Sequence, residues 1–131
     1  MIGLDTNVLL RLFTNDNPAQ TEAALALLEA QGPGGIRVDR LVMAELVWTL
    51  VRQYKRDRSQ IANIVEDLLA REELEFDDRD ITMTALERFR RSKADFADHL
   101  IAAANDRRGA TPTYTFDRDA AATRSFRLVG S

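Results

Sequence analysis

Apolar and polar residues follow one another in blocks that predict short strands separated by helices. The opening stretch Met1–Leu4 is apolar and is typical of a buried strand. Further strands are predicted at Ile36–Val38, Leu74–Phe76, Thr113–Phe116 and Phe126–Val129. All five stretches are short, and each is bounded by polar or turn-forming residues.

Helices are predicted between these strands, from apolar residues at helical spacing and from start and stop signals. A short helix follows Asp5-Thr6-Asn7, and another follows Asp117. The longer helices have apolar faces and are expected at Pro18–Ala30, from Arg40 to about Tyr54, from Ser59, after Asp78 or Asp80, and at Ala94–Arg108. Short strands alternating with helices predict an α/β/α sandwich around a mainly parallel sheet.

Composition limits the chemistry that this chain can perform. The 131 residues are 45% apolar and 30% charged, and no linker divides them, so we expect a single domain over residues 1–131. The absence of cysteine excludes thiolate chemistry, and His99 is the only histidine. The 21 Asp and Glu residues leave oxygen chemistry as the main resource.

Charge and hydropathy give two further expectations. The net charge of −3 is not typical of a nucleic-acid-binding protein, although arginine far outnumbers lysine. Arginine excess suits phosphate recognition, and it is equally explained by a GC-rich genome. No apolar run is long enough for a bilayer and no signal peptide is recognisable, so a cytoplasmic location is expected.

Two aspartates follow predicted strands. Asp5 comes after Met1–Leu4, and Asp117 after Thr113–Phe116. Ligand sites in parallel sheets form beyond the carboxyl ends of the strands. Either aspartate alone could be a helix N-cap, but two in the same architectural position favour a site.

Glu45 lies within a helix that is apolar on nearly every face. A buried carboxylate must be paired, protonated or functional, because an unpartnered buried charge is costly. The structural alternatives are an ion pair with Arg52 or exposure at the mouth of a crevice.

Asp95 and Asp98 share a face at the start of the helix Ala94–Arg108. Acidic residues are ordinary in a first turn, yet one of them could join a carboxylate cluster with the other supporting it. Clustered carboxylates need a neutralising cation, and oxygen ligands suit Mg²⁺ or Mn²⁺. His99 points about 100° away from Asp98 and is expected at the surface or rim.

Three hydroxyl and amide residues near these acids have two interpretations. Thr6, Asn7 and Thr115 could hydrogen-bond carboxylates or phosphate, or act as cap and turn residues. A phosphotransferase with Asp5 as nucleophile is disfavoured, because Asn7 stands where a second aspartate is usual. The glycine-rich segment 32–35 precedes a strand and not a helix, so it does not predict a phosphate-binding loop.

Four sequence segments, in the same order along the chain, resemble PIN-domain proteins, especially the VapC toxins of bacterial toxin–antitoxin pairs. They are IGLDTNVLLR from Ile2, VMAELVWTL around Glu45, DFADHLIA around Asp98 and TFDRD from Thr115. The similarity extends over essentially the whole chain.

The resemblance implies a PIN-like fold with an acidic site. Asp5, Glu45, Asp98 and Asp117 would be the catalytic acids, with Asp5, Asp98 and Asp117 as ligands of Mg²⁺ or Mn²⁺. Supporting roles would fall to Thr6, Asn7, Asp95 and Thr115, and Asp119 would lie at the rim.

The resemblance also implies an endoribonuclease that hydrolyses RNA phosphodiesters, a VapB-type antitoxin as partner, and a homodimer. Trp48 and Tyr54 could serve the antitoxin or dimer contact, or belong to the core. The alternatives are a PIN nuclease of RNA processing that is not a toxin, and a catalytically silent module that binds RNA or a partner. A silent module would be expected to have a broken acidic set, whereas here the set is complete.

Overall fold

Three short strands near the N-terminus pair in parallel in the computed structural model, which describes residues 1–130. They form one ladder, in the order β1 (Ile2–Gly3), β2 (Ile36–Val38), β3 (Leu74–Phe76). In β2, Ile36 and Val38 are buried while Arg37 between them is exposed. This alternation follows from the two-residue period of a strand.

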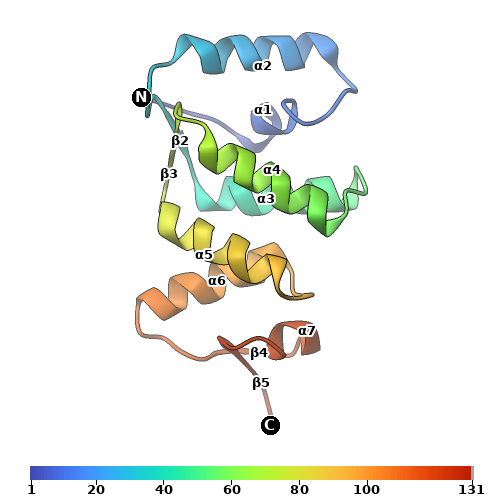
Figure 1. The fold of residues 1–131 in the computed structure, drawn as a ribbon, viewed down its shortest axis with the longest axis vertical. Helices are drawn as coiled ribbons and strands as arrows, with labels where there is room; N and C mark the ends of the chain where they lie inside the picture. The colour runs from blue at the N-terminus through green and yellow to red at the C-terminus, as the bar shows by residue number, and fades with distance from the viewer. Residues whose placement is uncertain (131) are drawn as a thin grey trace. The chain divides into compact units, whose positions relative to one another are not determined.

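Helices connect these parallel strands, as parallel pairing requires. Four lie in this part of the chain: α1 (Thr6–Leu10), α2 (Pro18–Ala30), α3 (Arg40–Arg52) and α4 (Arg58–Ala70). Figure 1 shows α3 and α4 passing one another. Their fully buried side chains are apolar and include Met43, Leu46, Leu50, Ile61, Val65 and Leu68.

Local signals explain where these helices begin and end. Asp57 and Gln60 form a reciprocal capping box at the start of α4. Helix α3 ends at Arg52, two residues before the predicted Tyr54. Lys55 takes a left-handed conformation (φ 54°), and the N–H of Arg56 bonds back to the carbonyl of Leu50 at 3.1 Å. This arrangement closes the helix as a glycine would.

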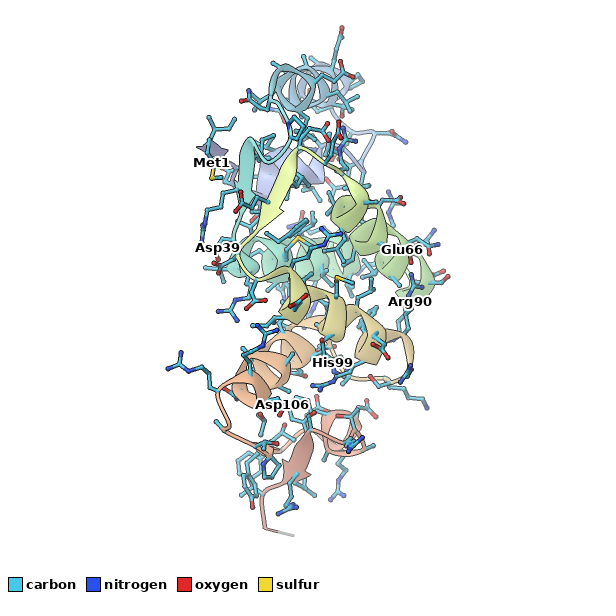
Figure 2. The ribbon with its side chains drawn as sticks, turned by 60° about the vertical axis from the view of Figure 1, so that its left-hand side comes forward. Met1, Asp39, Glu66, Arg90, His99 and Asp106 are labelled. Carbon is cyan, nitrogen blue, oxygen red and sulfur yellow. The ribbon has the colours of Figure 1, made fainter. Side chains whose placement is uncertain are left out.

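The rest of the chain contains two longer helices and a parallel pair of strands. Its elements are α5 (Arg79–Arg90), α6 (Phe96–Arg107), β4 (Thr113–Thr115), α7 (Arg118–Ala121) and β5 (Phe126–Leu128). Phe89 of α5 and Phe96 of α6 pack edge to face with ring centroids 5.8 Å apart. Figure 2 shows His99 and Asp106 on α6, and the chain leaves this helix through Gly109 at a φ of 76°.

The α/β fold with parallel strands is confirmed, and every strand predicted from the sequence is found within one or two residues of its expected bounds. The chain packs as two compact units, Met1–Arg79 and Asp80–Ser131. That both units act as one domain stays a prediction. Within the described residues, no helix combines the length and apolarity that crossing a membrane requires.

Candidate active site

The first predicted acid lies where β1 gives way to α1. Asp5 is exposed and caps α1, because its Oδ1 accepts the N–H of Val8 at 3.3 Å. The cap interpretation of Asp5 is therefore confirmed as a structural role. A single bond at 3.3 Å leaves the carboxylate accessible for other partners, so capping does not exclude ligand binding.

One side-chain contact links Glu45 to Thr6, the residue that follows Asp5. The hydroxyl of Thr6 donates to Glu45 Oε1 at 3.3 Å, which joins the start of α1 to the middle of α3. Glu45 is exposed, so the alternative of exposure agrees with the structure. The alternative ion pair with Arg52 is not formed, since the Arg52 guanidinium lies over the Trp48 ring at 5.6 Å.

A hollow of about 360 Å³ opens beside Asp5 and is lined also by Asn7 and Arg11. Arg11 is held in place by an ion pair with Asp16, to which the Tyr54 hydroxyl also donates at 2.6 Å. The hydrogen bond from Tyr54 is the largest cause that lowers the pKa of Asp16, with help from Arg11. The sequence analysis did not single out Arg11. Its position directly after the apolar residues Val8, Leu9 and Leu10 indicates a cation at the edge of the core, beside this hollow.

The second group of acids lies in the unit of residues 80–131. Asp95 occupies the N-cap position of α6 without a side-chain cap hydrogen bond, Asp98 lies in the first turn, and Asp117 follows β4. Burial raises the pKa of Asp98, and the charges of Asp95 and Asp117 raise it further. The backbone N–H of Asp95 opposes this shift by donating to the Asp98 carboxylate. Asp98 is therefore close enough to Asp95 and to Asp117 for their charges to oppose its own.

Asp117 is fixed by its own backbone and by a neighbour. Its Oδ1 accepts the N–H groups of Asp119 at 2.8 Å and Ala120 at 3.1 Å. The N–H of Asp117 donates to Thr115 Oγ1 at 2.9 Å. Thr115 thus orients the backbone that carries Asp117. Asp119 lies exposed two residues later, in α7.

The predicted position of His99 was wrong. His99 is fully buried, its Nε2 is 2.7 Å from Ser92 Oγ, and its ring packs against Phe126 with centroids 6.4 Å apart. Because α6 turns by about 100° per residue, Asp98 faces the other acids while His99 enters the core. His99 therefore takes no part in the acidic site.

The donor set fits a hard divalent cation. The side chains are carboxylates, hydroxyls and an amide, and a cation beside Asp98 would replace repulsion by attraction. Within residues 1–130, no three or more His, Cys, Asp or Glu side chains already have the placement of a formed metal site. Contacts nevertheless link the acids within each unit: Thr6, next to Asp5, donates to Glu45, and Asp98 lies near Asp95 and Asp117.

The family profile of the PIN domain matches residues 2–125, so the chain belongs to the PIN domain family. Proteins of this family are generally metal-dependent nucleases. No curated protein matches the chain. The family assignment extends over both compact units and includes all the acids described above.

Proposed function

We propose that this chain is a Mg²⁺- or Mn²⁺-dependent endoribonuclease and the VapC-type toxin of a toxin–antitoxin pair, acting on RNA in the cytoplasm. The observation that carries the nuclease proposal is the repulsive group of Asp95, Asp98 and Asp117, in a member of a nuclease family. Placing two further carboxylates beside Asp98, where burial already disfavours its charge, is typical of a site that a cation completes.

The roles follow from the local contacts. Asp5, Asp98 and Asp117 would hold the cation, which when bound supplies a positive charge to the phosphodiester and lowers the pKa of a water. The Thr6 hydroxyl orients the Glu45 carboxylate, which would accept a proton from the attacking water. Asp95 supports Asp98, Thr115 supports Asp117, and Asn7 offers an amide to phosphate.

Cleavage of total bacterial RNA by the purified chain in Mg²⁺, in Mn²⁺ and in EDTA tests the nuclease. We expect cutting with either metal, none in EDTA, and none from Asp5→Asn or Asp98→Asn, because asparagine keeps the size but removes the charge. If the acids act on the same step, the double variant should be no worse than either single variant. Cleavage by Asp98→Asn at the wild-type rate would refute its assignment as a ligand.

The toxin proposal needs its own experiment. Expression of the chain alone should halt growth, and co-expression of the neighbouring gene should restore it if that gene encodes the antitoxin. RNA cleavage without growth arrest would favour a PIN nuclease of RNA processing. No cleavage from folded, partner-free protein in any metal would favour the silent binding module.

A surface on α3 supports the proposal of a protein partner. Leu41, Trp48 and Val51 are exposed, Trp48 to 57%, and lie on one side of α3 at spacings of seven and three residues. Tyr54 is different, because its hydroxyl is bonded to Asp16. We propose that this apolar stripe serves the antitoxin, and that the chain also forms a homodimer. Trp48→Ser should weaken co-purification with the antitoxin and leave RNA cleavage unchanged.

A further inference from the structure

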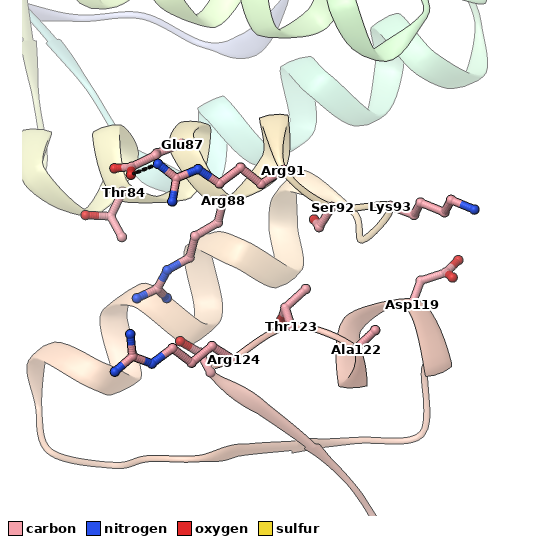
Figure 3. Close-up of a pocket in the computed structure, with 11 residues that line it drawn as sticks. Thr84, Glu87, Arg88, Arg91, Ser92, Lys93, Asp119, Ala122, Thr123 and Arg124 are labelled. Atoms are coloured by element: carbon pink, nitrogen blue, oxygen red, sulfur yellow. Dashed lines mark ion pairs between the residues drawn. The ribbon is translucent and has the colours of Figure 1, made fainter.

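A second pocket lies entirely within residues 84–125, apart from the four acids that the proposed nuclease uses. Its volume is about 600 Å³, and it lies between the C-terminal half of α5, the loop that follows, and the turn from α7 to β5 (Figure 3). Four cations and two carboxylates line it: Arg88, Arg91, Lys93, Arg124, Glu87 and Asp119. Such a concentration of cations is unexpected in a chain with a net charge of −3.

The ion pairs in the wall neutralise only part of this charge. Arg91 is paired with Glu87 at 2.7 Å, but both side chains are more than 60% exposed, so water screens the pair. Arg88 is paired with Asp106 at 3.0 Å. In the described part of the chain no carboxylate pairs with Arg124. In Figure 3 the guanidinium groups of Arg88 and Arg124 extend to the same side.

The chemistry of this wall suits a phosphate group. A guanidinium presents parallel N–H donors that match two phosphate oxygens, and hydroxyls can donate to the others. Thr84, Ser92 and Thr123 place hydroxyls in the lining. Ser92 is bonded to the buried His99, and Thr123 donates its hydroxyl proton to the carbonyl of Ala120, so both are oriented by the surrounding structure. Thr123 therefore has no second proton to donate to a phosphate.

Two short segments of the chain connect the lining of the pocket to the acidic group of the same unit. Ser92 and Lys93 line the pocket, and Asp95 follows two residues later. On the other side Asp119 lines it, and the N–H of Asp119 donates to Asp117 Oδ1 at 2.8 Å. A polyanion that lies over Asp98 and Asp117 and follows either segment would reach the cations of the pocket.

We infer that this pocket is a phosphate-binding subsite, which holds a backbone phosphate of the RNA next to the phosphodiester that is cut. The inference rests on the proposed nuclease function, and it explains how a protein with a net negative charge can hold RNA, which is a polyanion. The cations offset the repulsion between RNA and the carboxylates, and arginine geometry fixes the register of the strand.

The test compares two charge reversals of equal size on the full chain. Arg124→Glu changes the pocket, whereas Arg108→Glu changes an exposed arginine of the same unit outside the lining. Binding of a fluorescent single-stranded RNA of mixed sequence is measured in EDTA at several salt concentrations, so that cleavage does not interfere. Arg124→Ala is measured as well, and circular dichroism checks that each variant is folded.

We expect Arg124→Glu to weaken RNA binding by roughly tenfold or more, and Arg108→Glu by less than about threefold. Arg124→Ala should lower the slope of log K against log salt by about 0.7, as expected for one phosphate contact with a single strand. In Mg²⁺, Arg124→Ala should raise KM for a cleavable RNA and retain kcat.

Two results would overturn the subsite and leave the nuclease standing. One is wild-type cleavage with equal effects of Arg124→Glu and Arg108→Glu on binding. The other is a polyglutamate peptide that binds the wild type and loses binding in Arg124→Glu while RNA binding is unchanged, which would assign the pocket to an acidic protein segment. Absence of any RNA binding or cleavage by the wild type would instead overturn the proposed function, and the subsite with it.

Discussion

Helix α6 carries two aspartates in opposite electrostatic situations, one at each end. Asp98 in the first turn has a pKa raised by burial and by the charges of Asp95 and Asp117. Burial also disfavours the ionised form of Asp106 in the last turn. Hydrogen bonds from Ser125 and Arg88 outweigh the effect of burial and hold the pKa of Asp106 below its usual value. At one end of the helix an aspartate pKa is therefore raised, and at the other end one is lowered.

The helix dipole predicts the reverse of this pattern. A carboxylate is favoured near the N-terminus of a helix and disfavoured near the C-terminus. The dipole contributes at most about 1 kcal/mol at exposed positions, so direct neighbours outweigh it here. Asp106 is surrounded by donors, with Ser125 Oγ at 2.8 Å and Arg88 Nη1 at 3.0 Å, whereas Asp98 is surrounded by like charges. The end of α6 that is electrostatically unfavourable is the end that carries the proposed function.

The difference between Asp98 and Asp106 is tested most directly by neutralising each aspartate and measuring RNA cleavage. Asp98→Asn should lower kcat/KM by at least about 100-fold, the scale on which loss of one group that stabilises transition-state charge acts. Asp106→Asn should change it less than about threefold in the protein that remains folded. Similar losses from both substitutions would contradict the division of roles.

Stability should respond in the opposite order. Asp106→Asn removes the charge that pairs with Arg88 and should lower the free energy of unfolding by about 1–2 kcal/mol at pH 7. The matched control is Asp80→Asn, because Asp80 is 78% exposed and its ion pair with Arg107 is long, at 3.7 Å. This substitution should lower the free energy of unfolding by less than about 0.5 kcal/mol. Urea unfolding of the three proteins measures both differences.

The pH dependence of the Asp106 effect follows from its lowered pKa. The stabilisation by Asp106 is complete above the usual aspartate pKa of 3.8 and is lost as the pH falls through the lower value of the folded state. The difference between wild type and Asp106→Asn should therefore shrink in acid. A difference that stays constant down to pH 2 would show that packing, and not charge, explains the loss.

Local patterns were sufficient for most elements of this fold. The segments Pro18–Ala30, Ile36–Val38 and Leu74–Phe76 have in the structure the bounds that the sequence predicts. Asp5 and Asp117 were identified because residues after strands reach the surface of an α/β fold. These inferences need only period, caps and turn residues, which are encoded within a few positions of the chain.

Contacts between distant residues could not be predicted in the same way. Thr6 meets Glu45 across 39 positions, and Arg88 meets Asp106 across 18, so neither pair has a sequence signature. His99 was assigned to the surface or rim because it points about 100° away from Asp98, and its burial depends on Ser92 and Phe126 being brought to it by the fold. The basic pocket was missed for the same reason, since its cations come from α5, from the loop that follows it and from the turn before β5.

A smaller effect is expected at Asp98 when no metal is present. Because its folded pKa is raised, ionisation of Asp98 costs the folded state stability as the pH rises above 3.8. Asp98→Asn should therefore be more stable than the wild type in EDTA at pH 7, by a few tenths of a kcal/mol, as for a like-charge pair on a helix. Thermal unfolding in EDTA at pH 7 measures this gain. A loss of stability at pH 7 would mean that the Asp98 charge supports the fold.

The smallest change in stability is expected at Glu45. Glu45→Gln keeps the oxygen that accepts the Thr6 hydroxyl and removes only an exposed charge, so the free energy of unfolding in EDTA should change by less than about 0.5 kcal/mol. RNA cleavage should nevertheless fall, since glutamine cannot accept a proton from water. Thermal unfolding and cleavage measured on the same preparation separate the two effects. A large loss of stability with cleavage retained would make Glu45 a structural residue and remove it from the proposed acidic set. The proposed role of Asp98 at the N-terminal end of α6 does not depend on this outcome.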